Sequence, residues 1–315
     1  MSTSLLELCL IQLGVVLVGA VSVSAGALFY FRRVRLDRPP VGTFNVRDIG
    51  ILLVFVIALP FLYATLPRWA LTCFLAMTFA SALSIGYRPL LGAGRVWLGV
   101  GLLIGANLWT SRTMLGSVVG WQLWWLELSI LVALSAIAIA NLYVQGGMKL
   151  RYVAWFALAL AVYDLTFVRV VPLTNQLVQE FLGKPLDPSL GMRFGINNYS
   201  MGSGDLLVYA LFTVAAYKAY GRSAARLALG LIVVFGVCAP TLVPLVIDFL
   251  DARSDVIVPA QAFFGPAAFV CYLRLKNRYG PERTMAEYRA STRVAVVTPT
   301  ATHPAPDRDG RLQPV

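Results

Sequence analysis

The segment 152–171 reads YVAWFALALAVYDLTFVRVV, and it combines the two features that decide the fold and the chemistry of the chain. Its apolar length matches the roughly 20 residues that an α-helix needs to cross the hydrocarbon core of a bilayer. Its acid, Asp164, lies well inside the apolar run, where a carboxyl group is costly and is therefore expected to serve a function. The segment predicts a transmembrane helix that carries a functional acid.

Apolar runs of comparable length recur along most of the 315 residues. Hydrophobic side chains make up 58% of the chain and charged side chains 13%, which leaves far less polar surface than a soluble domain needs. The runs therefore predict an all-α polytopic membrane protein with nine transmembrane helices. The predicted helices cover residues 5–31, 49–66, 69–85, 96–109, 120–143, 152–171, 199–217, 227–247 and 256–273.

Basic residues alternate between the loops, and this pattern predicts the orientation because cytoplasmic loops retain Lys and Arg. The loops that follow the first, third, fifth, seventh and ninth predicted helices hold most of them. The opposite loops hold fewer, namely Arg68, Arg112, Lys184, Arg193 and Arg253. The amino terminus is therefore expected outside and the carboxyl terminus in the cytosol.

The distribution of charge and of metal-binding residues excludes several classes of function. The net charge of +11 comes from Lys and Arg scattered through loops, without the interleaved aromatic and basic surface that binds nucleic acid. The only histidine, His303, lies near the carboxyl terminus, so neither a histidine metal site nor a Ser-His triad can form within the membrane. We expect a lipid bilayer around the chain, no metal and no nucleic-acid partner.

The chain divides by composition into two parts. Residues 1–280 are interpreted as one nine-helix transmembrane domain. Residues 281–315 are interpreted as a disordered cytosolic tail, since they are rich in Pro, Thr, Arg and Ala and show no apolar periodicity. No oligomeric state follows from the sequence.

A second acid, Asp205, lies at the same predicted depth as Asp164. Asp164 follows Arg151 by 13 residues and Asp205 precedes Lys218 by 13 residues, which places each acid about 20 Å from the cytosolic end of its helix. The two helices are consecutive and antiparallel, so they are expected to be neighbours. Two close carboxyl groups cannot readily both ionise, so one keeps a proton while the other can activate water. The pair is therefore suited to acid–base chemistry.

Small residues and a proline accompany the acids. Gly202 and Gly204 precede Asp205, and their missing β-carbons allow a neighbouring backbone or a substrate to approach closely. In the predicted helix 256–273, Pro259 lies at nearly the same depth as the acids, where it removes a backbone hydrogen bond and bends or breaks the helix. A third element is therefore expected to reach the level of the acids.

These residues resemble the motifs of a known family, the presenilins and signal peptide peptidases, which are intramembrane aspartyl proteases of the Gly-x-Gly-Asp type. Tyr163-Asp164 resembles the Tyr-Asp motif, and Gly202-Ser203-Gly204-Asp205 resembles the Gly-x-Gly-Asp motif. The predicted orientation is similar to that of signal peptide peptidases and opposite to that of presenilins.

The third family motif, Pro-Ala-Leu on the ninth helix, corresponds here to Pro259-Ala260-Gln261. Gln261 therefore stands where the family has Leu. The resemblance implies active-site support or substrate binding by these three residues, as it does for Tyr163 and for the residues that precede Asp205.

The resemblance further implies an endopeptidase that hydrolyses peptide bonds in transmembrane helices or signal-peptide remnants. Asp164 and Asp205 would activate water, without a metal or an organic cofactor. Because helical hydrogen bonds shield peptide bonds, the substrate helix must partly unwind. The backbone at 198–201 is expected to pair with the extended segment as an added strand. With this orientation, the preferred substrates are helices with a cytosolic amino end.

Two other functions use the same residues. A proton-coupled transporter can employ a carboxyl pair as a proton relay, and an inactive scaffold can bind membrane helices without cleaving them. A structural polar contact between helices would also place the two acids together. Tyr163 either orients a carboxyl group through its hydroxyl or packs.

A third acid, Glu127, lies nearer the outer end of the predicted helix 120–143. Its neighbours Trp121, Trp124 and Trp125 are typical of the aromatic belt at a membrane interface. Glu127 is therefore interpreted as an interfacial residue.

Overall fold

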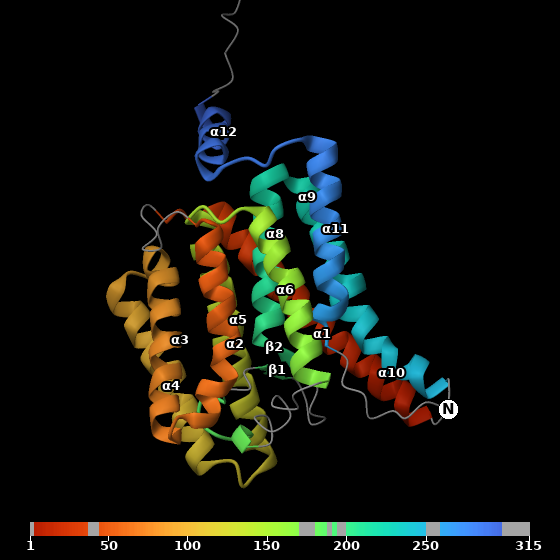
Figure 1. Cartoon of the computed structure of the whole chain (residues 1–315). Helices are drawn as coiled ribbons and strands as arrows, with labels where there is room; N and C mark the ends of the chain where they lie inside the picture. The colour runs from red at the N-terminus through yellow and green to blue at the C-terminus, as the bar shows by residue number, and fades with distance from the viewer. Residues whose placement is uncertain are drawn as a thin grey trace, which may run out of the picture.

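The computed structural model describes residues 3–36, 44–169, 180–187, 191–193, 200–249 and 259–297, and these are almost entirely helical. The first six helices are α1 (Thr3–Arg33), α2 (Val46–Thr65), α3 (Arg68–Leu91), α4 (Ala93–Thr113), α5 (Val118–Gln145) and α6 (Leu150–Arg169). They are followed by β1 (Gly191–Arg193), β2 (Ser200–Gly202), α8 (Ser203–Tyr220), α9 (Arg222–Leu231), the π-helix η1 (Ile232–Cys238), α10 (Ala239–Phe249), α11 (Gln261–Tyr279) and α12 (Met285–Val297). The long helices lie side by side, with α12 beyond one end of the bundle and the two strands towards the other (Figure 1).

Six helical segments are long and apolar enough to cross a membrane. They are Cys9–Arg33, Val46–Thr65, Arg68–Leu91, Val118–Gln145, Leu150–Phe167 and Arg222–Val243. The predicted all-α class is confirmed, and the six segments indicate a multi-pass membrane protein. The three remaining predicted helices correspond to α4, α8 and α11, which are not among the six.

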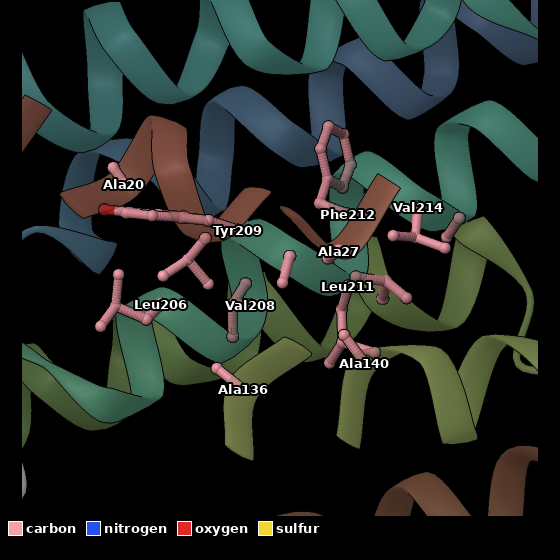
Figure 2. Close-up of a cluster of buried hydrophobic side chains, with 14 of the residues drawn as sticks. Ala20, Ala27, Ala136, Ala140, Leu206, Val208, Tyr209, Leu211, Phe212 and Val214 are labelled. Atoms are coloured by element: carbon pink, nitrogen blue, oxygen red, sulfur yellow. The ribbon is translucent and has the colours of Figure 1, made fainter. Parts of the chain in front are cut away.

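Helix α8 forms the centre of the bundle and packs against α1, α5, α6, α9 and α11. Its side chains are buried around the whole circumference from Leu206 to Ala216, apart from the half-buried Leu207. Small residues allow this, because α1 and α5 face α8 with alanines such as Ala20 and Ala136 (Figure 2). Helix α8 is therefore held on all sides, which fixes the position of Asp205 at its start.

Helix α11 crosses α6 at close range through Gly265. A β-carbon at this position would lie 2.5 Å from the carbonyl oxygen of Ala157 and 2.9 Å from the β-carbon of Ala161. Only glycine therefore permits the two helix backbones to approach so closely. The crossing lies three residues from Asp164 on α6 and four residues from Gln261 on α11.

The carboxyl-terminal segment differs from the sequence prediction. Residues 281–315 were expected to be disordered, but Met285–Val297 form α12. Thr284 and Glu287 make a capping box, in which the Thr284 N–H donates to Glu287 (2.7 Å) and the Glu287 N–H donates to the Thr284 hydroxyl (3.2 Å). The buried ring of Tyr288 then packs against Phe31 of α1 and Tyr217 of α8. A cap and an aromatic anchor thus stabilise a helix without a long apolar run.

Candidate active site

Asp164 and Asp205 come together from two adjacent helices. Asp164 lies near the end of α6, five residues before Arg169, and Asp205 lies in the first turn of α8. Both side chains are half-buried, and they lie close enough for an electrostatic interaction between the two carboxyl groups. The structure therefore places the two acids in the same site, as their equal predicted depth implies.

The start of α8 differs from the predicted helix 199–217 and explains the spacing of the glycine motif. The helix begins at Ser203, with Gly202 as its N-cap, so Asp205 occupies the third helical position. From this position a carboxylate can reach back to the N-cap backbone, and the Gly202 backbone hydrogen-bonds Asp205. A β-carbon on Gly202 would lie 3.1 Å from Oδ2 of Asp205 and would crowd that carboxyl group.

The residues before α8 form a strand that the sequence did not predict as a paired element. Strand β2 pairs antiparallel with β1, with Met192 opposite Met201 and Gly191 opposite Gly202. Of the predicted strand-forming residues 198–201, Ser200 and Met201 belong to β2, and the other two lie outside the described residues. A two-stranded sheet therefore leads directly into the acid-bearing turn.

Gln261 makes the closest polar contact with the acid pair. Helix α11 begins at this residue, immediately after Pro259 and the N-cap Ala260, so the proline ends up before the helix instead of inside it. The Gln261 Nε2 donates a 2.8 Å hydrogen bond to Oδ1 of Asp205. The Gln261 side chain is only 2% exposed, and its Oε1 has no hydrogen-bond partner among the described residues. The residue that departs from the family motif thus contacts the acid directly.

The positive ends of two helices support a negative charge at this site. The first turns of α8 and α11 meet through the hydrogen bond between Gln261 and Asp205. Each helix start carries about half a positive charge from its free N–H groups. In the described part of the chain, no Lys or Arg forms an ion pair with Asp164 or Asp205. The helix ends and the Gln261 amide therefore take the place of a cationic partner.

The remaining predicted site residues have distinct surroundings. The Tyr163 ring packs 4.4 Å from that of Phe167, and no hydrogen bond links its hydroxyl to a described residue, which favours packing over orientation of a carboxyl group. Ser203 is half-buried at the first position of α8. Gly204 is exposed, and a β-carbon there would meet nothing within 4 Å, so the backbone beside Asp205 is open to approach.

Tyr209 is a site neighbour that the sequence reasoning did not identify. It lies one turn after Asp205, is fully buried, and packs 4.7 Å from the ring of Phe264 on α11. Its hydroxyl donates a 3.0 Å hydrogen bond to the Gly236 carbonyl in η1. Pro240, four residues after Gly236, has no N–H to offer that carbonyl, so the tyrosine satisfies it. The sequence offered two signals for this contact. One is a tyrosine inside an apolar segment, and the other is a proline that interrupts a later helix.

Glu127 belongs to a separate polar contact. The Thr110 hydroxyl on α4 donates a 2.9 Å hydrogen bond to its Oε1, and the half-buried side chain does not join the acid pair. Trp124 is 0% exposed and Trp125 8%, so these two rings are buried and the predicted aromatic belt is wrong for them. Glu127 thus faces a neighbouring helix.

The arrangement offers acid–base chemistry by two carboxyl groups. Within residues 3–36, 44–169, 180–187, 191–193, 200–249 and 259–297, no group of three His, Cys, Asp or Glu residues is placed to hold a metal ion. No known protein-family model, characterised protein or solved structure matches the chain. The functional assignment therefore depends on the residues and geometry described above.

Proposed function

We propose that the protein is an intramembrane aspartyl endopeptidase, similar to presenilins and signal peptide peptidases. The observation that carries the proposal is the meeting of Asp164 and Asp205 from two helices, with the Gln261 amide donating to one of them. Two coupled carboxyl groups share one proton, which equips them to act as a general base and a general acid at once. The six apolar helices support the membrane part of the proposal.

The hydrogen bond from Gln261 supports different roles for the two acids. A donor stabilises a charged carboxylate more than a neutral acid, and a carboxylate is favoured in the first turn of a helix. Asp205 is therefore the ionised base, and Asp164 carries the proton. Gln261 acts through Asp205 and is a positioning residue.

Hydrolysis then follows in two balanced steps. Asp205 takes a proton from water as the water oxygen bonds to the scissile carbonyl carbon, and Asp164 gives its proton to the carbonyl oxygen. The resulting tetrahedral diol collapses when Asp205 gives its proton to the amide nitrogen and Asp164 regains one from a hydroxyl group. The C–N bond breaks, and the pair returns to its starting state.

The proposed substrate is a transmembrane helix that unwinds locally. Strand β2 ends at Gly202, three residues before Asp205, and an exposed strand edge can pair with an extended peptide. The open face at Gly204 leaves room for a backbone next to the acid. Helices with a cytosolic amino end fit the proposed orientation, with the amino terminus of the protein outside.

The proposed topology counts nine membrane-crossing helices. The three that are less apolar, α4, α8 and α11, contain 21, 18 and 19 residues. At 1.5 Å per residue they extend about 27–32 Å, which matches the hydrocarbon thickness. Polar residues near the acid site and the helix ends account for their lower hydropathy.

A fluorogenic transmembrane peptide separates protease from transporter and scaffold. Purified protein in liposomes should cleave the peptide, with products identified by mass spectrometry, and an aspartyl transition-state analogue should block cleavage. Proton uptake driven by a solute gradient without any cleavage would instead support the transporter, which the acid pair also permits. Helix binding that persists in both Asp164→Asn and Asp205→Asn, without cleavage by the wild type, would support the scaffold.

A further inference from the structure

Three basic residues that are far apart in the sequence line one cavity at the end of α3 and α4. Arg68 is the first residue of α3, Arg112 lies in the last turn of α4, and Lys184 comes from the segment 180–187. All three lie in predicted external loops, where basic residues are sparse. Their convergence therefore needs an explanation other than membrane orientation.

The cavity is much larger than a water site and has both charged and apolar lining residues. Its volume is about 230 Å³, well above the roughly 10–15 Å³ that one water needs. The buried side chains of Leu71 and Phe181 contribute apolar lining, and Trp69, which is 73% exposed, contributes an aromatic wall. A ligand with both a charged group and an apolar part matches this combination.

The three cations have no counter-charge among the residues that the structure describes. No hydrogen bond or ion pair engages their side chains within the described part of the chain. Glu180 and Asp187 flank Lys184 in sequence, but neither lines the cavity, and Asp187 is fully buried. Like charges repel, so an anion that binds all three lowers the energy of the site.

We propose that this cavity binds the phosphate group of an anionic phospholipid. Guanidinium groups bind phosphate oxygens through paired hydrogen bonds, and an ammonium adds a third contact. The cavity lies where two long helices end, and an exposed tryptophan is typical of the membrane–water boundary. Lipid phosphates lie at this height, which favours a headgroup over free phosphate, although both share the same chemistry. The inference does not depend on the proposed protease activity.

The test measures lipid binding to purified full-length protein by native mass spectrometry. Phosphatidylglycerol, phosphatidylcholine and inorganic phosphate are titrated separately onto wild type and onto the triple variant Arg68→Gln, Arg112→Gln, Lys184→Gln. A matched control replaces three exposed basic residues at the opposite end of the bundle, Arg222, Arg226 and Lys276, by Gln.

Wild type should bind phosphatidylglycerol more tightly than phosphatidylcholine, and the triple variant should lose roughly 10- to 100-fold in affinity for phosphatidylglycerol. The control triple should bind as wild type does. Equal phosphatidylglycerol binding by wild type and the cavity triple overturns the proposal. Binding of inorganic phosphate without selective phosphatidylglycerol binding overturns the lipid assignment. If the triple variant does not fold, Arg112→Gln alone should weaken binding severalfold, and unchanged binding overturns the proposal.

Discussion

The two ends of α8 have contrasting surroundings. Near its carboxyl end, Lys218 is fully buried and donates a 2.7 Å hydrogen bond to the Met148 carbonyl. At its amino end, Asp205 is half-buried beside Gln261, which has an unused oxygen, and beside the open Gly204. The charged group near the carboxyl end of α8 forms a buried hydrogen bond with the turn between α5 and α6. The acid at the amino end lies beside a polar side chain and an open backbone, as a reactive group requires.

Further contacts fix the Lys218 end. The Glu282 carboxylate accepts a 2.6 Å hydrogen bond from the Leu150 N–H and so caps α6. The Gln145 side chain accepts from the Leu36 N–H (2.8 Å) and donates to the Val34 carbonyl (3.1 Å) beyond α1. These hydrogen bonds connect the end of α1 with α5, and the start of α6 with the residues that precede α12.

The largest expected effect comes from breaking the close contact at the acid end. Gly265→Ala should lower the free energy of unfolding by about 2–3 kcal/mol and reduce cleavage severalfold, because the added β-carbon pushes α11 away from α6. Thermal unfolding and peptide cleavage measure both effects. The matched control Gly101→Ala, where a β-carbon would meet nothing within 4 Å, should be neutral or slightly stabilising. Equal effects of the two substitutions would refute the proposed role of the crossing.

Gln261→Leu should change the pH dependence of cleavage, which sharpens the contrast between the two ends of α8. The substitution removes one partner of the hydrogen bond and leaves the charged Asp205 without a donor worth about 1.5–3 kcal/mol. The acidic limb of kcat/KM should therefore move to higher pH by roughly one to two units. A pH profile measured with the fluorogenic peptide tests this. An unshifted limb would show that Gln261 does not set the charge of Asp205.

Tyr209→Phe should destabilise the protein by about 1–2 kcal/mol, since the Gly236 carbonyl loses its buried donor. Tyr163→Phe removes a hydroxyl that makes no hydrogen bond to a described residue and serves as the matched control, with little change expected. Thermal unfolding of both variants checks the difference. Similar midpoints for the two variants would contradict the role assigned to Tyr209.

The smallest expected effect is the loss of α12 stability when the Glu287 carboxyl of its capping box is protonated. The Thr284 backbone N–H, which donates to Glu287, lowers the pKa of that carboxyl, so the stabilisation is present above its unfolded pKa of about 4.3 and is lost as pH falls through the folded pKa. Hydrogen exchange over residues 285–297, corrected for intrinsic rates, should lose protection severalfold in acid. Glu287→Gln keeps an acceptor that does not titrate and should lose less. Identical acid loss in both proteins would exclude the cap.

Much of the fold follows from apolar length and acid depth. The all-α class and the meeting of Asp164 with Asp205 follow from long runs and equal residue counts on antiparallel helices. The start of α12 could also have been predicted, because Thr284 and Glu287 have the spacing of a capping box. The Pro- and Thr-rich composition after Gly280 favoured a prediction of disorder instead.

Other features depend on tertiary contacts that no local pattern encodes. The role of Gln261 requires α11 to begin directly after Ala260 and to lie beside the first turn of α8. The β1–β2 pairing joins short segments with little strand character of their own. The cation-lined cavity joins residues separated by more than a hundred positions.

The most direct test of the central claim compares peptide cleavage by wild type, Asp164→Asn, Asp205→Asn and the double variant in one assay. Groups that act as a unit are not additive, so each single substitution should abolish cleavage as fully as the double one, with thermal stability retained. Substantial cleavage by either single variant, with loss only in the double, would contradict the shared-proton pair.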